Sequence, residues 1–228
     1  MKQPLLLLHG ALSSAKQFFL LQNILSEKYD VHTLNFPGHG GEDIPPEFSI
    51  PLFADTVLHY MDEKNITSVN IFGYSMGGYV ALYVAAHHPG RVNKIFTLAT
   101  KFDWTPQSAS RETSMLNPEV IMEKVPAFAK SLEQMHSPQD WKVVLSRTSD
   151  LLMNLGNKPA LSEKELQNID IPVVISVGEL DKMVTVEESS NAAHQIKNGS
   201  FCLFPSTPHP FEKVNHSTLA EKMNEYFD

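Results

Sequence analysis

The stretch Val69-Asn70-Ile71-Phe72-Gly73-Tyr74-Ser75-Met76-Gly77-Gly78 carries the most information about the fold. Its first four residues are mainly apolar and predict a short buried strand, and the alanine-rich segment after Ser75 predicts a helix that ends near His88. The pattern Gly-x-Ser-x-Gly between them predicts a sharp turn from strand to helix, on which a serine hydroxyl stands clear of the backbone. Glycines at positions 73 and 77 remove side chains that would clash there, so Ser75 is a candidate nucleophile.

The same alternation of a short apolar run, a turn and a helical pattern continues on both sides of this turn. Six strands are predicted, at residues 5–8, 31–34, 69–72, 95–98, 173–177 and 201–204. Helices are predicted at residues 15–27, 50–64, 76–88, 187–196 and 217–227. Most of the runs are continuously apolar, as in strands covered on both faces. The pattern therefore predicts an α/β fold with a doubly wound, mainly parallel six-stranded sheet.

Residues 103–168 interrupt this rhythm, because they contain helical patterns and prolines but no strand pattern. We expect them to form a helical cap inserted after the fourth strand, with the last of its helices belonging to the core. Residues 1–102 and 169–228 then form the core. Most apolar side chains of the segment should pack against one another and against the core, and a few should face a cleft and shape a nonpolar substrate pocket.

Composition narrows the possible partners. The chain has 228 residues and 18 basic against 26 acidic side chains, a net charge of −8 that argues against binding nucleic acid or an anionic membrane. We expect a cytoplasmic protein, since neither a signal-peptide pattern nor a membrane-spanning run is found and the single Cys202 cannot form an internal disulfide. Ligand-spaced His and Cys residues and glycine-rich phosphate loops are also missing, so we expect no metal and no cofactor.

Five motifs occur in a characteristic order: Leu7-Leu8-His9-Gly10, Phe36-Pro37-Gly38-His39-Gly40, the Ser75 turn, Gly178-Glu179-Leu180-Asp181, and His209 after the last strand. In order and approximate spacing the chain resembles the α/β-hydrolase superfamily, especially its small capped esterase, thioesterase and lyase-like members. Two features depart from the family pattern. The usual opening antiparallel hairpin is missing, and Thr207-Pro208 precedes the histidine where a glycine is common.

The resemblance implies a catalytic triad of Ser75, Asp181 and His209, in the chain order that this fold uses. His216 is an alternative base, although it is expected to begin or cap the last helix. Asp103, which follows the fourth strand, is an alternative acid, and Glu179 and Asp150 are weaker candidates.

The family pattern also implies an oxyanion hole built from the backbone amides of Ala11 and Met76, with Leu12 as the alternative to Ala11. His9 and His39 are expected to brace their loops.

These expectations describe a serine hydrolase that cleaves a small carboxylic ester or thioester through an acyl-enzyme on Ser75. Its substrate would be a small molecule with a partly apolar acyl group. A cofactor-free lyase or a perhydrolase using the same triad is the main alternative, because one fold supports several chemistries. A non-catalytic ligand-binding or signalling protein is a third possibility.

Overall fold

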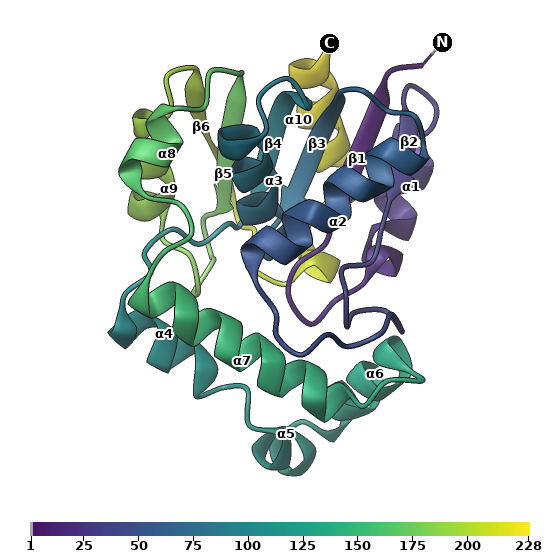
Figure 1. The fold of residues 1–228 in the computed structure, drawn as a ribbon, viewed down its shortest axis with the longest axis vertical. Coiled ribbons are helices and arrows are strands. Elements are labelled where there is room, and N and C mark those ends of the chain that lie inside the picture. The colour runs from purple at the N-terminus through teal and green to yellow at the C-terminus, as the bar shows by residue number, and fades with distance from the viewer. Residues whose placement is uncertain (1) are drawn as a thin grey trace.

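A computed structural model describes residues 2–228. Its centre is a six-stranded, fully parallel sheet in the order β2-β1-β3-β4-β5-β6, which confirms the predicted fold class (Figure 1). The strands are β1 (Pro4–Leu8), β2 (Asp30–Thr33), β3 (Val69–Tyr74), β4 (Val92–Leu98), β5 (Val173–Gly178) and β6 (Gly199–Phe204). The chain reverses its direction of winding after β2, so β1 and β3 lie side by side in the sheet. This switch point is where open parallel sheets bind ligands, beyond the carboxyl ends of the strands.

The central strands are buried as their apolar sequences predict, but the edge strands are not. Every residue of β3 and β5 is buried. On the two edges, β2 contains no buried residue and β6 buries only Phe204. The expectation of strands covered on both faces therefore holds in the middle of the sheet and is wrong at its edges, where one side has no neighbouring strand to pack against.

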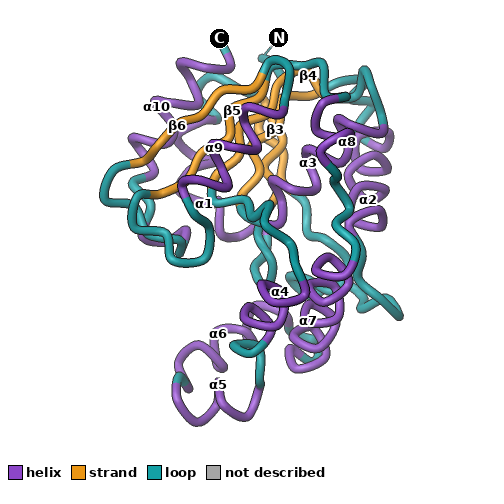
Figure 2. Tube along the Cα trace, turned by 90° about the vertical axis from the view of Figure 1, so that its left-hand side faces the viewer, coloured by secondary structure: helices purple, strands orange, loops and turns teal. Residues whose placement is uncertain are grey.

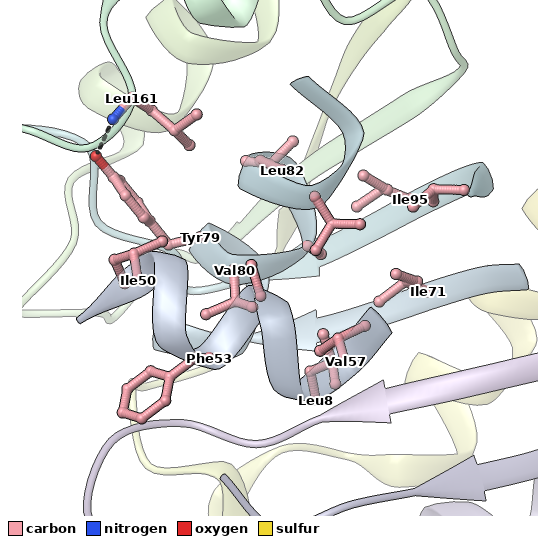
Figure 3. Close-up of a cluster of buried hydrophobic side chains, with 14 of the residues drawn as sticks. Leu8, Ile50, Phe53, Val57, Ile71, Tyr79, Val80, Leu82, Ile95 and Leu161 are labelled. Atoms are coloured by element: carbon pink, nitrogen blue, oxygen red, sulfur yellow. Dashed lines mark hydrogen bonds between the residues drawn. The ribbon is translucent and has the colours of Figure 1, made fainter. Parts of the chain in front are cut away.

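Helices cover both faces of the sheet (Figure 2). Apolar residues of α1 (Phe19–Leu25) and α10 (His216–Phe227) pack on one face. On the other face lie α2 (Ile50–Glu63), α3 (Met76–His87) and α9 (Val186–Gln195). Figure 3 shows the second core, in which Val57 and Val80 from α2 and α3 lie against Leu8, Ile71 and Ile95 of the strands. On this face α3 packs against β1, β3, β4 and α2, and this packing positions the turn that contains Ser75.

The predicted helix at residues 15–27 forms in two parts. It begins as a 3₁₀ turn, η1 (Ala15–Phe18), and continues as α1. The amide of Ala15 donates to the side-chain Oδ1 of Asn35, 2.8 Å away, and the Ser14 side chain provides no cap. A tight 3₁₀ turn is common at a helix N-terminus, and this one is satisfied by a residue 20 positions away that the local sequence does not reveal.

Between β4 and β5 the chain forms helices only. They are α4 (Pro106–Thr113), α5 (Pro118–Lys124), α6 (Pro126–His136), α7 (Trp141–Asn157) and α8 (Glu163–Gln167). The first three begin with a proline, which suits the first helical position because its missing N–H needs no partner there. In Figure 1, α4 to α7 lie beyond the carboxyl ends of the strands. Their role as a separate cap, with domain limits at 103 and 168, stays a prediction.

Two of these helices also join the main core. Leu151 and Leu155 of α7 and Leu166 of α8 belong to the same buried cluster as α3. Tyr79 of α3 accepts a hydrogen bond from the amide of Leu161, at 2.9 Å (Figure 3). Among residues 2–228, no helix combines the length and the apolar character needed to cross a bilayer.

Candidate active site

Ser75 lies at the junction of β3 and α3 in a strained backbone conformation. Its φ of 51° and ψ of −118° fall outside the regions that non-glycine residues favour. Neighbouring glycines permit the turn, because a Cβ atom at Gly73 would overlap the backbone of Gly78, and one at Gly77 would overlap the carbonyl oxygen of Leu8. The hydroxyl of Thr100 donates to the carbonyl of Ser75, at 3.1 Å. The strain is thus held by close packing of β1, β3 and α3, as expected for a serine presented to a ligand.

His209 and Asp181 form a directly hydrogen-bonded pair. The Nδ1 atom of His209 lies 2.7 Å from Oδ2 of Asp181, and the Asp181 side chain is fully buried. The other carboxylate oxygen accepts from the amides of Met183 and Val184, at 2.8 and 2.9 Å. This fixes the carboxylate, so that Nδ1 of His209 donates to Asp181 and Nε2 is left free to act as a base.

Tyr74 contacts His209 through both its hydroxyl group and its ring. Its hydroxyl donates to the backbone carbonyl of His209, at 2.8 Å, and the two rings lie 5.7 Å apart. Gly10 lies against the Tyr74 ring, where a Cβ would come within 2.9 Å of it. Burial raises the pKa of Tyr74, so its hydroxyl stays protonated and remains a donor. This contact joins residues 135 positions apart, and no local sequence pattern predicts it.

The alternative residues lie elsewhere. Asp103 is exposed, and its amide donates to Glu188. The Glu179 carboxylate accepts from the amide of Ser206, and Asp150 lies 3.8 Å from Arg147 on α7. His216 is the first residue of α10, as expected, and its ring lies against Phe211. Of the candidate acids and bases, the structure pairs only Asp181 with His209.

Ser75, His209, Ala11 and Met76 all line one cavity of about 90 Å³. Met76 is the first residue of α3, and the first backbone amides of a helix have no partner within the helix and are able to bind an anion. Leu12, the alternative to Ala11, has a φ of 58° and does not line the cavity. The structure therefore brings together all five residues predicted for the site: four of them line the cavity, and Asp181 is hydrogen-bonded to His209.

The cavity wall is otherwise mainly apolar. Its apolar lining residues are Ile50, Trp104, Leu151, Leu152, Leu155, Met183 and Val184. Trp104 and Leu151 belong to the helical segment from which a few apolar side chains were expected to shape a nonpolar pocket. Met115, Val120, Met122 and Phe128, which lie farther along the same segment, are exposed at the surface instead. Sequence reasoning did not identify two charged lining residues, Lys101 and Glu112.

His9 braces the loop that carries Ala11, as expected. It is fully buried, its Nδ1 donates to the carbonyl of Gly10 at 2.8 Å, and its Nε2 accepts from the amide of Phe36 at 3.1 Å. Burial lowers the pKa of His9 to about 4, so the ring stays neutral at physiological pH. Both ring nitrogens are occupied, which excludes His9 as the catalytic base. Residues 2–228 contain no cluster of His, Cys, Asp and Glu side chains suited to a metal ion.

Comparison with known proteins identifies a family and several relatives that this chain resembles. A model of the alpha/beta hydrolase fold family matches residues 3–134, more than half of the chain. A pimeloyl-[acyl-carrier protein] methyl ester esterase of Neisseria meningitidis is 29% identical over 215 residues, covering 85% of this chain and 81% of the relative. An esterase of the same name from Vibrio cholerae is 28% identical over 232 residues, covering 92% and 88%.

Solved structures show the same fold. A putative lipase from Acinetobacter baumannii superimposes with a TM-score of 0.83 at 19% sequence identity, covering 99% of this chain and 83% of the other. The chain belongs to the alpha/beta hydrolase fold family, which confirms the resemblance seen in the sequence. Relatives named as esterases and hydrolases support the predicted class of enzyme, one that hydrolyses esters.

Proposed function

We propose that this protein hydrolyses a small carboxylic ester or thioester through an acyl-enzyme formed on Ser75. One observation carries the proposal: the hydrogen-bonded pair of His209 and Asp181 opens onto the same small cavity as the strained serine of the β3–α3 turn. A serine hydroxyl is a weak nucleophile at neutral pH and needs a neighbouring base. His209 is the histidine that lines this cavity and has a carboxylate on its other nitrogen.

In the first half of the reaction, Oγ of Ser75 attacks the carbonyl carbon of the ester while Nε2 of His209 accepts the hydroxyl proton. Negative charge develops on the carbonyl oxygen, and the amides of Ala11 and Met76 stabilise it. Asp181 keeps the imidazole in the required tautomer and stabilises its positive charge. The imidazolium then gives its proton to the departing alcohol or thiol, which leaves the acyl group bonded to Ser75.

In the second half, His209 takes a proton from a water molecule as that water attacks the acyl carbon. The tetrahedral intermediate collapses, Oγ of Ser75 regains a proton from His209, and the carboxylic acid leaves. Each step uses the same two donors and the same base, so the cavity needs only one arrangement of side chains.

The pocket supports a small, partly apolar acyl group. Leu151, Leu152 and Leu155 of α7 contribute apolar surface within a cavity of only about 90 Å³. The esterases of Neisseria and Vibrio are named for a methyl ester of a pimeloyl group, which is likewise an acyl chain with an apolar middle. The methyl ester and the acyl-carrier protein in those names belong to the relatives and are not part of the proposal for this chain.

A panel of p-nitrophenyl esters of increasing acyl length tests the proposal. Wild type should hydrolyse the short members, and Ser75→Ala should reduce kcat by about 10⁴-fold or more without changing the unfolding midpoint, because loss of a triad member leaves little beyond binding and the oxyanion hole. Ser217→Ala, at an exposed position in the first turn of α10, is the matched control and should retain full activity. Hydrolysis that persists in Ser75→Ala would refute the proposal.

A further inference from the structure

A group of charged and polar side chains is buried in the wall of the apolar pocket. Lys101 follows β4 and is 9% exposed, and Glu112 of α4 is 3% exposed. Both line the cavity together with Trp104, whose ring lies 5.8 Å from the Lys101 ammonium. Burying charges beside apolar surface is costly unless each is well paired. The wall therefore contains a feature that neither packing nor the proposed triad chemistry requires.

The Lys101 ammonium is only partly satisfied by its neighbours. Its Nζ donates to the carbonyl of Met183, at 3.2 Å. The Oε1 atoms of Glu112 and Glu188 are each 3.9 Å away, close enough for charge attraction but too far for a hydrogen bond. An ammonium carries three N–H groups, so Lys101, which is one of the residues lining the cavity, retains donor capacity that its protein neighbours do not use.

Two further atoms lack partners. Oε1 of Glu112 lies 3.3 Å from the guanidinium of Arg111, but the buried Oε2 has no hydrogen-bond partner among residues 2–228. The indole Nε1 of Trp104 is likewise buried without a partner in that part of the chain. In contrast, the Glu188 carboxylate accepts from the amides of Phe102 and Thr185. One unpaired acceptor and two incompletely used donors thus occur together on one wall.

The charges already present decide what kind of group fits. Lys101 faces two carboxylates, and Arg111 supplies a second positive charge at the surface, so the cluster has no net charge. An additional carboxylate would lie beside Glu112 and Glu188, and an additional ammonium beside Lys101. A neutral group that both donates and accepts avoids these repulsions, can donate to Oε2 of Glu112 and can accept from Lys101 or Trp104.

We propose that Lys101, Trp104 and Glu112 form a polar subsite of this pocket that binds a neutral hydroxyl or primary amide group on the acyl part of the substrate. This inference rests on the proposed function of the same site and specifies its substrate class: short acyl esters with one neutral hydrogen-bonding group. The apolar residues of α7 then surround the methylene groups between that polar group and the ester.

Matched pairs of p-nitrophenyl esters test the subsite. The two esters of a pair have acyl chains of the same length, one ending in a methyl group and the other in a hydroxyl group. A third ester of that length ends in a carboxylate. At one short chain length wild type should prefer the hydroxyl ester over the methyl ester in kcat/KM by about 10- to 100-fold, the factor expected for a buried hydrogen bond to a charged group. The carboxylate ester should be the poorest of the three.

Variants assign the preference to these residues. Glu112→Gln removes the charge at nearly constant shape, and Trp104→Phe removes the indole donor. Each should reduce the ratio of kcat/KM for the hydroxyl ester to kcat/KM for the methyl ester at least several-fold. Arg111→Gln is the matched control, since its side chain is 66% exposed and contacts the other oxygen of Glu112, and it should keep the preference. If both site variants instead lower stability and reduce turnover of all esters equally, the cluster is purely structural and the proposal is wrong.

Calorimetry of the Ser75→Ala variant provides a readout that does not need turnover. Methyl esters of the same hydroxylated and plain acids are titrated into Ser75→Ala and into Ser75→Ala carrying Trp104→Phe. Tighter binding of the hydroxylated ester, lost in the double variant, supports the subsite even if wild type hydrolyses none of the esters, a result that would count against the proposed function alone. Equal affinity for both esters together with equal kcat/KM at every chain length would overturn the subsite.

Discussion

Lowering the pH from about 7.5 to about 5.5 should destabilise the fold through its buried histidines. His9, His39 and His136 are fully buried and lie in a row, with ring centroids 5.3 Å apart for the first pair and 5.8 Å apart for the second. They connect the loop after β1, the loop after β2 and the end of α6. Burial is the main cause that lowers the pKa of His9 to about 4, that of His39 well below its usual value, and that of His136.

The sign follows from proton binding. Below the unfolded pKa of 6.5, the unfolded chain protonates these rings while the folded protein keeps them neutral, so stability is fully present above that value and is lost as the pH falls toward the folded pKa. Over the stated interval the loss is about 1 to 1.5 kcal/mol for each histidine that stays neutral. His9 and His39 together should therefore reduce the free energy of unfolding by roughly 3 kcal/mol.

Urea unfolding at the two pH values measures this loss in wild type and in two variants. His39→Phe should lose about 1 kcal/mol less than wild type on acidification, because one neutral buried imidazole has been removed. His59→Gln is the control: its side chain is 76% exposed on α2, and it should respond to pH as wild type does. Titration of carboxyl groups is common to all three proteins and cancels in the comparison. An identical pH response of His39→Phe and wild type would refute the reasoning.

Three further substitutions, and a control substitution at Asp103, test the geometry of the site. Asp181→Asn should lower kcat by about 10⁴-fold, since the imidazole of His209 loses the acceptor that fixes its tautomer. Asp103→Asn, at an exposed position, is the control and should leave ester hydrolysis unchanged. Equal losses of kcat in the two variants would contradict the pairing of Asp181 with His209. Tyr74→Phe removes the donor to the His209 carbonyl and should lower kcat several-fold with KM nearly constant, measured against an unchanged unfolding midpoint; a change confined to KM would argue against positioning. Gly77→Ala should destabilise the protein by about 2 kcal/mol or more in urea unfolding, because its Cβ overlaps a β1 carbonyl; a fully stable variant would contradict the close packing of that turn.

Local patterns were enough to predict the sheet and the turn at Ser75. Continuous apolar runs identify the central strands, and glycines at 73 and 77 are needed where β3 meets α3. The proximity of Asp181 and His209 was also predictable, because residues that follow parallel strands meet at one edge of the sheet.

Other features depend on packing between distant segments and left no local signal. Lys101 and Glu112 look like ordinary surface charges in the sequence. They are buried because Lys101 lies between Glu112 of α4, Glu188 of α9 and the loop that follows Asp181. Tyr74 occupies a variable position of the Gly-x-Ser-x-Gly pattern, so its bond to His209 emerges only in three dimensions. The 3₁₀ start of α1 likewise depends on Asn35, which belongs to another loop.

The most direct measurement is mass spectrometry of the folded protein after treatment with a fluorophosphonate, a reagent that bonds to activated serines. We expect one adduct per chain, located on the peptide that contains Ser75, with labelling strongly slowed in His209→Ala and absent in Ser75→Ala. A folded wild-type protein that stays unlabelled, or that is labelled on another serine, would contradict the assignment of Ser75 as the nucleophile. Labelling of His209→Ala at the wild-type rate would contradict its activation by His209.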